Sequence, residues 1–523
     1  MIFVGFLNNN IDVRLLFFIK RHKWALLVLL LYLVLRLTNL TLLPIFNDES
    51  IYLDWGWREI HNPGFLYYSL YDAKQPFLMW IFGIFEVLFF NPLLGARIVS
   101  VIAGMFTLFG IYYFCRKYFN QKTAVISSLF YIFIPIFSFY DRLALMESAV
   151  SACGIWAGIL FAEVAKKSTF KKSILLGLVL GVGFFIKSNV FIFVLSFILI
   201  SFILFLKSKQ KIQFTKAVFI TLITFLCTIS FLLINPQFWS TLSTNSRYSL
   251  TIFELLHFPI TNWIANLLGN LEIAFFYLTP LILIFLLLGV FKGIKEKNKY
   301  PLVFLAFFGL SFFITTLLTR AALDRYIVSF MPFVCVFAGY FVYSVFLKNR
   351  YFGFLLFSAV LISTAVFTVA QIINPPFYLK TMAKLTSRNQ LIYLQGVNSG
   401  YGIADTVSFI KSKAVNRPLF IGVAENTGNP ESAMFVYFNK EKNFSTAYFD
   451  ARLLGIDITP YQCLSLGVDF LFVSRDNQQG GLEKFLEKIK TINNPYGNNS
   501  IGIYQLKKDC KGKYLELSVK KNL

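Results

Sequence analysis

Long apolar runs recur along most of this chain, and they constrain its fold more than any other feature. A helix of about twenty apolar residues crosses the hydrocarbon core of a bilayer, and runs near that length recur between Trp24 and Ile373. Only 14% of the residues are charged, whereas a soluble globular domain carries about 25%. We therefore predict an α-helical polytopic membrane protein.

About eleven crossings are predicted from these runs. They are expected at residues 24–43, 93–114, 123–139, 143–164, 173–185, 190–206, 217–234, 273–290, 302–318, 326–346 and 352–373. One further apolar run, Phe77–Phe90, has about fourteen residues, and as a helix it covers about 21 Å of a core about 30 Å thick. We predict that it lies as an interfacial helix in the first outer loop.

Basic residues predict the orientation of these crossings, because lysine and arginine concentrate in cytoplasmic loops. Basic clusters fall at the N-terminus and then in every second loop, at residues 20–23, 116–122, 166–172, 207–216, 292–299 and 348–350. A multi-pass plasma-membrane protein with a cytoplasmic N-terminus is expected, with residues 44–92, 235–262 and those after 374 facing outward. These clusters account for the net charge of +23, so we expect membrane lipids and no nucleic acid as partners.

The last segment has the mixed composition of a small domain. We predict a transmembrane domain over residues 1–376 and an extracytoplasmic α/β domain over residues 377–523. Within the latter, strands are expected at residues 418–424, 470–474 and 501–506, and helices at residues 404–413 and 481–490. Cys463 and Cys510 both lie there, either as a disulfide or as two free thiols.

Two adjacent acids, Asp48 and Glu49, directly follow the first predicted span. Carboxylates at a membrane surface are unfavourable unless they are solvated or used in function. A second interpretation is a helix start, where Asn47 or Asp48 caps the first turn and the helix dipole favours acids. Chemistry alone leaves catalysis and capping open.

Cations on the expected outward face also need an explanation, since positive charge is scarce there. Lys187, Arg320 and Arg325 are such residues, and an anion bound at the outer interface would account for them. The alternative is simple ion pairing, in which Asp324 pairs with Arg325 and Asp141 pairs with Arg142.

Five short segments, in order, carry a resemblance to a known family. They are Asp48-Glu49, Lys74-Gln75-Pro76-Phe77-Leu78, Ala96-Arg97, the stretch from Asp141-Arg142 to Glu147, and Arg325-Tyr326 with Pro332. Their order resembles the bacterial relatives of the protein O-mannosyltransferases and of the aminoarabinose transferase that modifies lipid A, within the type C glycosyltransferases. The resemblance covers roughly residues 20–375. Gln75 stands where the family has a proline, and Glu147 stands where it has an aspartate.

This resemblance implies an integral membrane glycosyltransferase that moves a sugar from a polyprenyl-phosphate donor to a glycan, lipid or protein acceptor, with inversion at the sugar. It implies Asp48 as general base, with Glu49 and Glu147 as supporting catalytic residues. The implied substrate-binding residues are Lys74, Asp141, Arg142, Lys187, Arg320, Arg325 and Tyr326. A divalent metal is left open, because the outer loops offer only His61 and His257, without close ligand spacing.

A multi-pass transporter or flippase of a lipid-linked or anionic substrate is the main rival function. Coupled carriers place charged residues near the membrane midplane or break helices in matched halves. Here Arg36 is the only charge well inside a predicted span, and the halves of the chain share no pattern. A lipid-linked polymer ligase or polymerase would share the same outer-face site, and the sequence separates it poorly from a single-sugar transferase.

Overall fold

The computed structural model of the chain describes residues 22–207, 210–386, 390–414, 418–424, 428–448, 469–475 and 486–507. It divides into two compact units. The helical unit holds Met1–Asn39, Leu70–Phe77 and Ser100–Ile373, and the mixed unit holds Leu40–Ser69, Leu78–Val99 and Asn374–Leu523. The proposed domain boundary at residue 376 stays a prediction.

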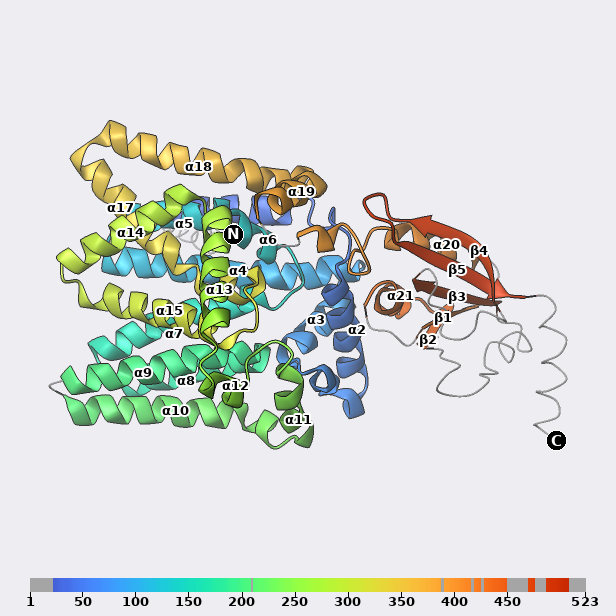
Figure 1. The fold of residues 1–523 in the computed structure, drawn as a ribbon, viewed down its shortest axis with the longest axis horizontal. Coiled ribbons are helices and arrows are strands. Elements are labelled where there is room, and N and C mark those ends of the chain that lie inside the picture. The colour runs from blue at the N-terminus through green and yellow to red at the C-terminus, as the bar shows by residue number, and fades with distance from the viewer. Residues whose placement is uncertain are drawn as a thin grey trace, which may run out of the picture. The chain divides into compact units, whose positions relative to one another are not determined.

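Helices account for the described secondary structure of the helical unit. After a helix over residues 22–37 they are α4 (Pro92–Tyr118), α5 (Gln121–Phe133), α6 (Pro135–Asp141), α7 (Glu147–Lys166), α8 (Phe170–Ile186), η3 (Ser188–Val190), α9 (Phe191–Lys207), α10 (Lys211–Leu233), α11 (Pro236–Asn245), α12 (Ile252–Leu256), α13 (Ile260–Leu278), α14 (Pro280–Lys295), α15 (Lys299–Leu318), α16 (Asp324–Ile327), η4 (Val328–Phe330), α17 (Phe333–Lys348) and α18 (Arg350–Ile373). The α7, α8, α9, α10 and α15 helices lie side by side (Figure 1).

Among the described residues, six helices are long and apolar enough to cross a membrane, or up to nine if each of three bent pairs is one span. The other two predicted crossings fall on shorter helices, over residues 22–37 and in α8. The predicted fold class, a polytopic helical membrane protein, is confirmed. The short α3 helix (Phe77–Leu88) has 12 residues, and its place at the interface stays a prediction.

Each bent pair breaks next to a proline, at Pro135, Pro280 and Pro332, with bends of 68°, 106° and 54°. Proline lacks an N–H and disfavours helical geometry in the residue before it. The crossing predicted over residues 273–290 falls on the second pair, so this segment is bent at Pro280 and is not one continuous helix. The chain turns sharply at Thr279, whose φ is 73°, and α13 runs across the direction of α7–α10 (Figure 1).

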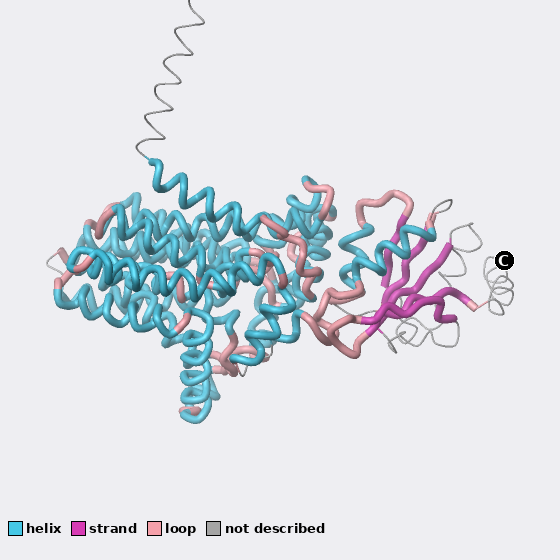
Figure 2. Tube along the Cα trace, turned by 90° about the horizontal axis from the view of Figure 1, so that it is seen from above, coloured by secondary structure: helices cyan, strands magenta, loops and turns pink. Residues whose placement is uncertain are grey.

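The mixed unit combines helices with one sheet (Figure 2). Its elements are α2 (Asn47–His61), η1 (Pro63–Phe65), most of α3, α19 (Pro375–Leu385), η5 (Gln390–Tyr393), α20 (Ile403–Lys413), β1 (Leu419–Val423), α21 (Glu431–Phe438), β2 (Phe444–Tyr448), β3 (Asp469–Arg475), β4 (Leu486–Asn493) and β5 (Ser500–Leu506). The 3-10 helix η2 covers Tyr68–Asp72, at the boundary between the two units.

The strand order is β2-β1-β3-β5-β4. The β1 strand is parallel to β2 and β3, whereas β5 is antiparallel to β3 and β4. Ile421, Val423, Phe472, Val473 and Ile503 are fully buried in this sheet, and α20 and α21 pack against it. A small α/β arrangement in the C-terminal part of the chain is confirmed.

Three predicted strands and the helix at residues 404–413 are confirmed by β1, β3, β5 and α20. The predicted helix at residues 481–490 is wrong in its described part, which begins β4 at Leu486. An irregularity between Lys488 and Lys490 inserts one extra residue of β4 against β5. Because a bulge interrupts the alternation of side chains along a strand, this strand accommodates apolar residues every three positions, at Leu486, Ile489 and Ile492. That spacing resembles the spacing of a helix. Cys463 and Cys510 lie outside the described residues.

Candidate active site

The Glu147 cluster joins three residues that the sequence singled out. The α7 helix begins at Glu147, whose side chain is fully buried. Lys187 Nζ and Arg325 Nε each lie 3.0 Å from the same carboxylate oxygen, Oε1. Lys187 directly follows α8 and Arg325 lies in α16, so three separate segments converge on one carboxylate.

The charges of this cluster do not balance. Two cations face one carboxylate, and the side chains of Lys187 and Arg325 are 19% and 22% exposed, against 0% for Glu147. A buried carboxylate thus holds two cations in place while both keep a solvent-accessible part. Such an arrangement suits the binding of an anion through charge-assisted hydrogen bonds.

Polar atoms beside this cluster also lack partners. Gln75 Oε1 accepts a hydrogen bond from the Ser188 N–H at 3.0 Å, which brings the Lys74-Gln75-Pro76 segment to the turn after Lys187. Within the part of the chain that the structure describes, Gln75 Nε2, Asn189 Oδ1 and Glu147 Oε2 are buried without a hydrogen-bond partner. Buried polar groups are normally paired, so this grouping favours a site over a purely structural contact.

The other end of α7 provides a contrast in the same unit. Glu163 also faces two lysines, Lys117 at 2.6 Å and Lys172 at 3.1 Å. Here, however, Oε1 accepts from Lys117 and from the Tyr118 hydroxyl, while Oε2 accepts from Lys172. Both oxygens of Glu163 are bonded, which is the pattern of a structural ion-pair network.

Asp141 and Arg142 are buried, and each has protein partners. Asp141 pairs with Arg36 at 3.1 Å and accepts hydrogen bonds from Tyr131 and Ser148. The Arg142 guanidinium donates to the carbonyl oxygens of residues 35, 36 and 39. The carboxylate that was expected to pair with Arg142 is thus bonded to Arg36. The substrate contacts predicted for Asp141 and Arg142 stay predictions.

Two further cations that were predicted to bind substrate, Arg320 and Lys74, lie beside the segment that joins α11 to α13. Arg320 pairs with Glu254 at 2.8 Å, as the ion-pairing interpretation requires. The Thr251 N–H and Arg320 lower the pKa of Glu254 to about 2, so this pair stays charged. Lys74 Nζ lies 4.9 Å from the centre of the Tyr248 ring. Tyr326 follows Arg325 in α16.

In the mixed unit, the two adjacent acids have different surroundings. Glu49 is fully buried and makes a two-pronged ion pair with Arg97, with distances of 2.8 and 2.6 Å. Arg97 also donates to the carbonyl oxygens of Leu40 and Leu43, and Glu49 accepts from the Phe46 N–H. Glu49 therefore fixes the start of α2. The predicted cap at Asn47 or Asp48 is wrong, because the N-cap is Phe46 and both residues lie inside the helix, but acids do occupy the first turn. Asp48, in the same turn, is only half-buried.

Arg97 was not predicted as the partner of Glu49. It appeared only as part of the Ala96-Arg97 resemblance, with no partner assigned. A charge at the start of an apolar run, as in α4, is itself a signal, because a buried arginine requires a carboxylate or several carbonyls.

A pH-dependent stability is expected from Glu59, which lies in α2 and is 1% exposed. Burial raises the pKa of Glu59 to about 8, although the Ser69 N–H partly opposes the rise. A carboxyl whose folded pKa is raised stabilises the fold below its unfolded pKa of about 4.3, and this stabilisation is lost as the pH rises through 8. Glu59→Gln should therefore have a free energy of unfolding higher than that of wild type at pH 9, by on the order of 5 kcal/mol, and should differ little from wild type at pH 5.

Thermal unfolding of the purified chain at both pH values measures this effect. Glu487→Gln is the matched control, since Glu487 is an exposed acid of the same unit. Equal pH dependence in wild type and Glu59→Gln would contradict the assignment.

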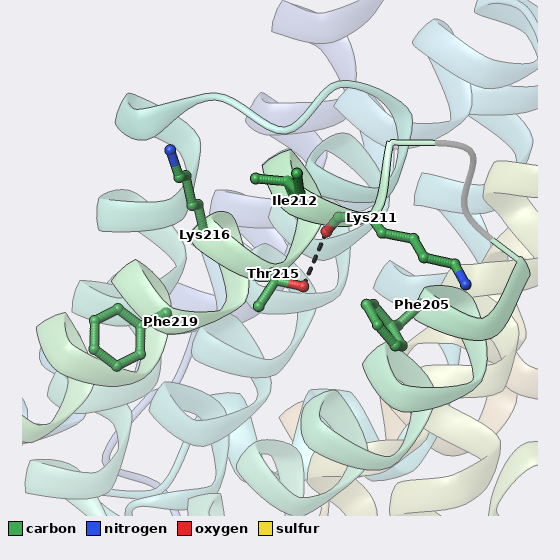
Figure 3. Close-up of a pocket in the computed structure, with 6 residues that line it drawn as sticks. All are labelled: Phe205, Lys211, Ile212, Thr215, Lys216 and Phe219. Carbon is green, nitrogen blue, oxygen red and sulfur yellow. Dashed lines mark hydrogen bonds between the residues drawn. The ribbon is translucent and has the colours of Figure 1, made fainter.

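A cavity of about 470 Å³ lies where α9 ends and α10 begins (Figure 3). Its walls include Phe205, Ile212 and Phe219. Lys211 and Lys216 point away from one another in Figure 3, so their charges do not converge on one ligand. We assign no chemistry to this apolar groove. Among the described residues, no group of three or more His, Cys, Asp or Glu side chains is placed to hold a metal ion, and no residue is assigned to one.

Comparison with known proteins relates this geometry to a family. Residues 73–235 match the family model for dolichyl-phosphate-mannose-protein mannosyltransferase. The apo structure of ArnT from Cupriavidus metallidurans has the same fold, with a TM-score of 0.55 at 12% identity over 92% of this chain and 98% of that chain. Residues 73–235 are thus similar in sequence to this mannosyltransferase family, and the chain as a whole shares the fold of ArnT.

The ArnT structure from the same organism bound to undecaprenyl phosphate is similar to this chain with a TM-score of 0.51 and 13% identity, over the same shares of both chains. No curated protein matches the sequence. The family match begins just before Lys74 and ends after α10. It therefore includes Glu147 and Lys187, whereas Asp48 and Arg325 lie outside it.

Proposed function

We propose that this chain is a type C glycosyltransferase, which transfers a sugar from a polyprenyl-phosphate-linked donor to a glycan, lipid or protein acceptor on the outer face of the plasma membrane. The observation that carries the proposal is the Glu147 cluster, with its excess cation and its unpartnered polar atoms. The family name, which specifies a dolichyl-phosphate sugar, supports a lipid-phosphate donor. The complex of ArnT with undecaprenyl phosphate supports it as well.

The two cations have a clear task in this reaction. As the bond between the anomeric carbon and the phosphate oxygen breaks, negative charge grows on the phosphate that stays with the carrier. Phosphate is a weak base, so fixed positive charge stabilises it more effectively than a proton donor does. Lys187 and Arg325 supply that charge, and Glu147 acts as the positioning residue that holds both. Lys74 is a further candidate contact for the phosphate.

The acceptor must lose a proton as its oxygen or nitrogen bonds to the anomeric carbon. We assign Asp48 as the base that receives this proton, because a carboxylate within hydrogen-bond reach raises such rates by about 10² to 10⁴. Attack from the side opposite to the phosphate inverts the anomeric centre. The Glu49–Arg97 pair fixes the turn that carries Asp48, so Glu49 acts as a positioning residue.

Membranes that contain the chain, incubated with radiolabelled polyprenyl-phosphate sugars, test this function. We expect label to leave the carrier fraction and appear covalently in a glycan, lipid or protein fraction. Label that crosses the bilayer while still attached to its carrier would favour the transporter or flippase. Unchanged carrier-bound label would count against transfer.

A further inference from the structure

The C-terminal part of the mixed unit holds a cavity of about 210 Å³ that the proposed reaction does not use. Val397, Ser399, Tyr401, Asn429, Arg475 and Asn498 are among the residues that line it. Asparagine, serine and tyrosine side chains predominate in this wall, and these groups both donate and accept hydrogen bonds. The cavity is therefore suited to a polar ligand rather than to a lipid chain.

The cavity lies at one end of the sheet, beside the ends of β1 and β3. Asn429 lies in the loop that follows β1, and Arg475 is the last residue of β3. Since β1 and β3 are parallel neighbours, the cavity lies at the carboxyl ends of two parallel strands. Sheets of α/β domains commonly bind ligands at this end. On the far side, Ser500 and Ile501 at the start of the antiparallel β5 complete the wall.

The amide of Asn429 is one of the polar groups of this wall. Asn429 is 2% exposed, and its Nδ2 donates to the carbonyl oxygens of Ile45 and Ser399 at 3.0 and 3.3 Å. These bonds set the plane of the amide. Within the described residues, Asn429 Oδ1 has no hydrogen-bond partner. A hydroxyl of a ligand would satisfy this acceptor.

The charge of the site favours a neutral ligand. Arg475 is the one cation among the lining residues, and its Nε lies 3.3 Å from a carboxylate oxygen of Glu431 and donates to the Asn429 carbonyl at 2.7 Å. Glu431 is fully buried, so its charge compensates that of Arg475. An anionic ligand would have to compete with Glu431 for the same guanidinium.

From these features we infer that the cavity binds one neutral sugar unit of the acceptor. The inference rests on the proposed function and narrows its acceptor to a glycan. The volume of the cavity, about 210 Å³, is below the roughly 300–1,000 Å³ of sites for drug-sized ligands. This size suits a single sugar ring with many hydroxyls. Tyr401, which packs edge-on against Tyr496, offers an aromatic surface to the ring. An extended peptide would pair with an edge strand, β2 or β4, whereas β3 and β5 are interior strands.

Saturation-transfer NMR on the purified full chain in detergent tests the inference. The probes are methyl glycosides of neutral hexoses, pentoses and N-acetylhexosamines, together with an acidic methyl hexuronoside and a short unglycosylated peptide. We expect at least one neutral glycoside to bind. Val397→Trp, which places a ring at the partly exposed cavity wall, and Asn498→Ala, at its exposed rim, should each weaken that binding by about tenfold or more.

Ser408→Trp is the matched control, because Ser408 is an exposed residue of α20 that does not line the cavity. It should leave glycoside binding unchanged. Absence of binding by every neutral glycoside, preferential binding of the hexuronoside or peptide, or wild-type binding by Val397→Trp and Asn498→Ala would overturn the inference. Donor turnover in the membrane assay is scored separately, so loss of the proposed transfer remains distinguishable from loss of glycoside binding.

Discussion

Asp48→Asn is expected to lower the rate of sugar transfer by about 10² to 10⁴ and to leave donor affinity unchanged. Asparagine keeps the size of the side chain in the first turn of α2, but it cannot accept the proton of the acceptor. The substitution therefore separates a catalytic role of Asp48 from a structural one. If Asp48 only stabilises the first turn of α2, the variant will transfer sugar at the wild-type rate.

The measurement is single-turnover transfer from a radiolabelled polyprenyl-phosphate sugar, in membranes with matched amounts of each variant. Asp405→Asn is the control, because Asp405 also lies in the first turn of a helix, α20. It should keep wild-type transfer. A rate for Asp48→Asn within a factor of two or three of wild type would remove Asp48 from the mechanism.

Arg97→Met is expected to destabilise the mixed unit by about 3–5 kcal/mol. The substitution leaves the buried Glu49 carboxylate without its cation and removes the donor for the Leu40 and Leu43 carbonyl oxygens. The free energy of unfolding in detergent, measured with denaturant, should show this loss, which is large for any single substitution.

A double variant isolates the ion pair from the other bonds. Glu49→Gln combined with Arg97→Met should be less destabilised than the sum of the single variants, because no unpaired charge remains buried. Lys411→Met breaks the exposed pair of Lys411 with Glu441 and should cost less than about 1 kcal/mol. If Arg97→Met costs as little as Lys411→Met, the Glu49–Arg97 pair is not what fixes the start of α2.

The apolar runs predicted where helices lie because crossing a membrane requires a fixed length of apolar sequence, which is a local property of the chain. The bends in the helix pairs also have a local cause, because each lies beside Pro135, Pro280 or Pro332. The length of an apolar run does not reveal such a bend. The β4 strand was misread for another reason. Its irregularity between Lys488 and Lys490 gives a strand the apolar spacing of a helix.

The site was predicted as a set of residues on one face, and the only pairs considered joined neighbours in the sequence, Asp324 with Arg325 and Asp141 with Arg142. Lys187 and Arg325 are 40 and 178 residues from Glu147 in the sequence, and no local pattern specifies such contacts. Two buried pairs, Arg36 with Asp141 and Arg97 with Glu49, were missed for the same reason. A physical signal was present, because a charge within an apolar segment needs a partner of opposite sign.

We propose that the Glu147 cluster binds the phosphate of the donor carrier. The affinity of the purified chain for a short polyprenyl phosphate, compared with its affinity for the matching uncharged polyprenol, tests this binding most directly. The variant Glu147→Gln/Lys187→Gln/Arg325→Gln removes all three charges, so no unpaired carboxylate stays buried. The control Glu163→Gln/Lys117→Gln/Lys172→Gln removes the same kinds of charge from the bonded cluster at the other end of α7.

Wild type and the Glu163 control should bind the phosphate at least about tenfold more tightly than the alcohol. The Glu147 variant should bind the two lipids equally, with an unchanged affinity for the alcohol. If the Glu147 variant still binds the phosphate more tightly than the alcohol, the Glu147 cluster does not bind the donor phosphate.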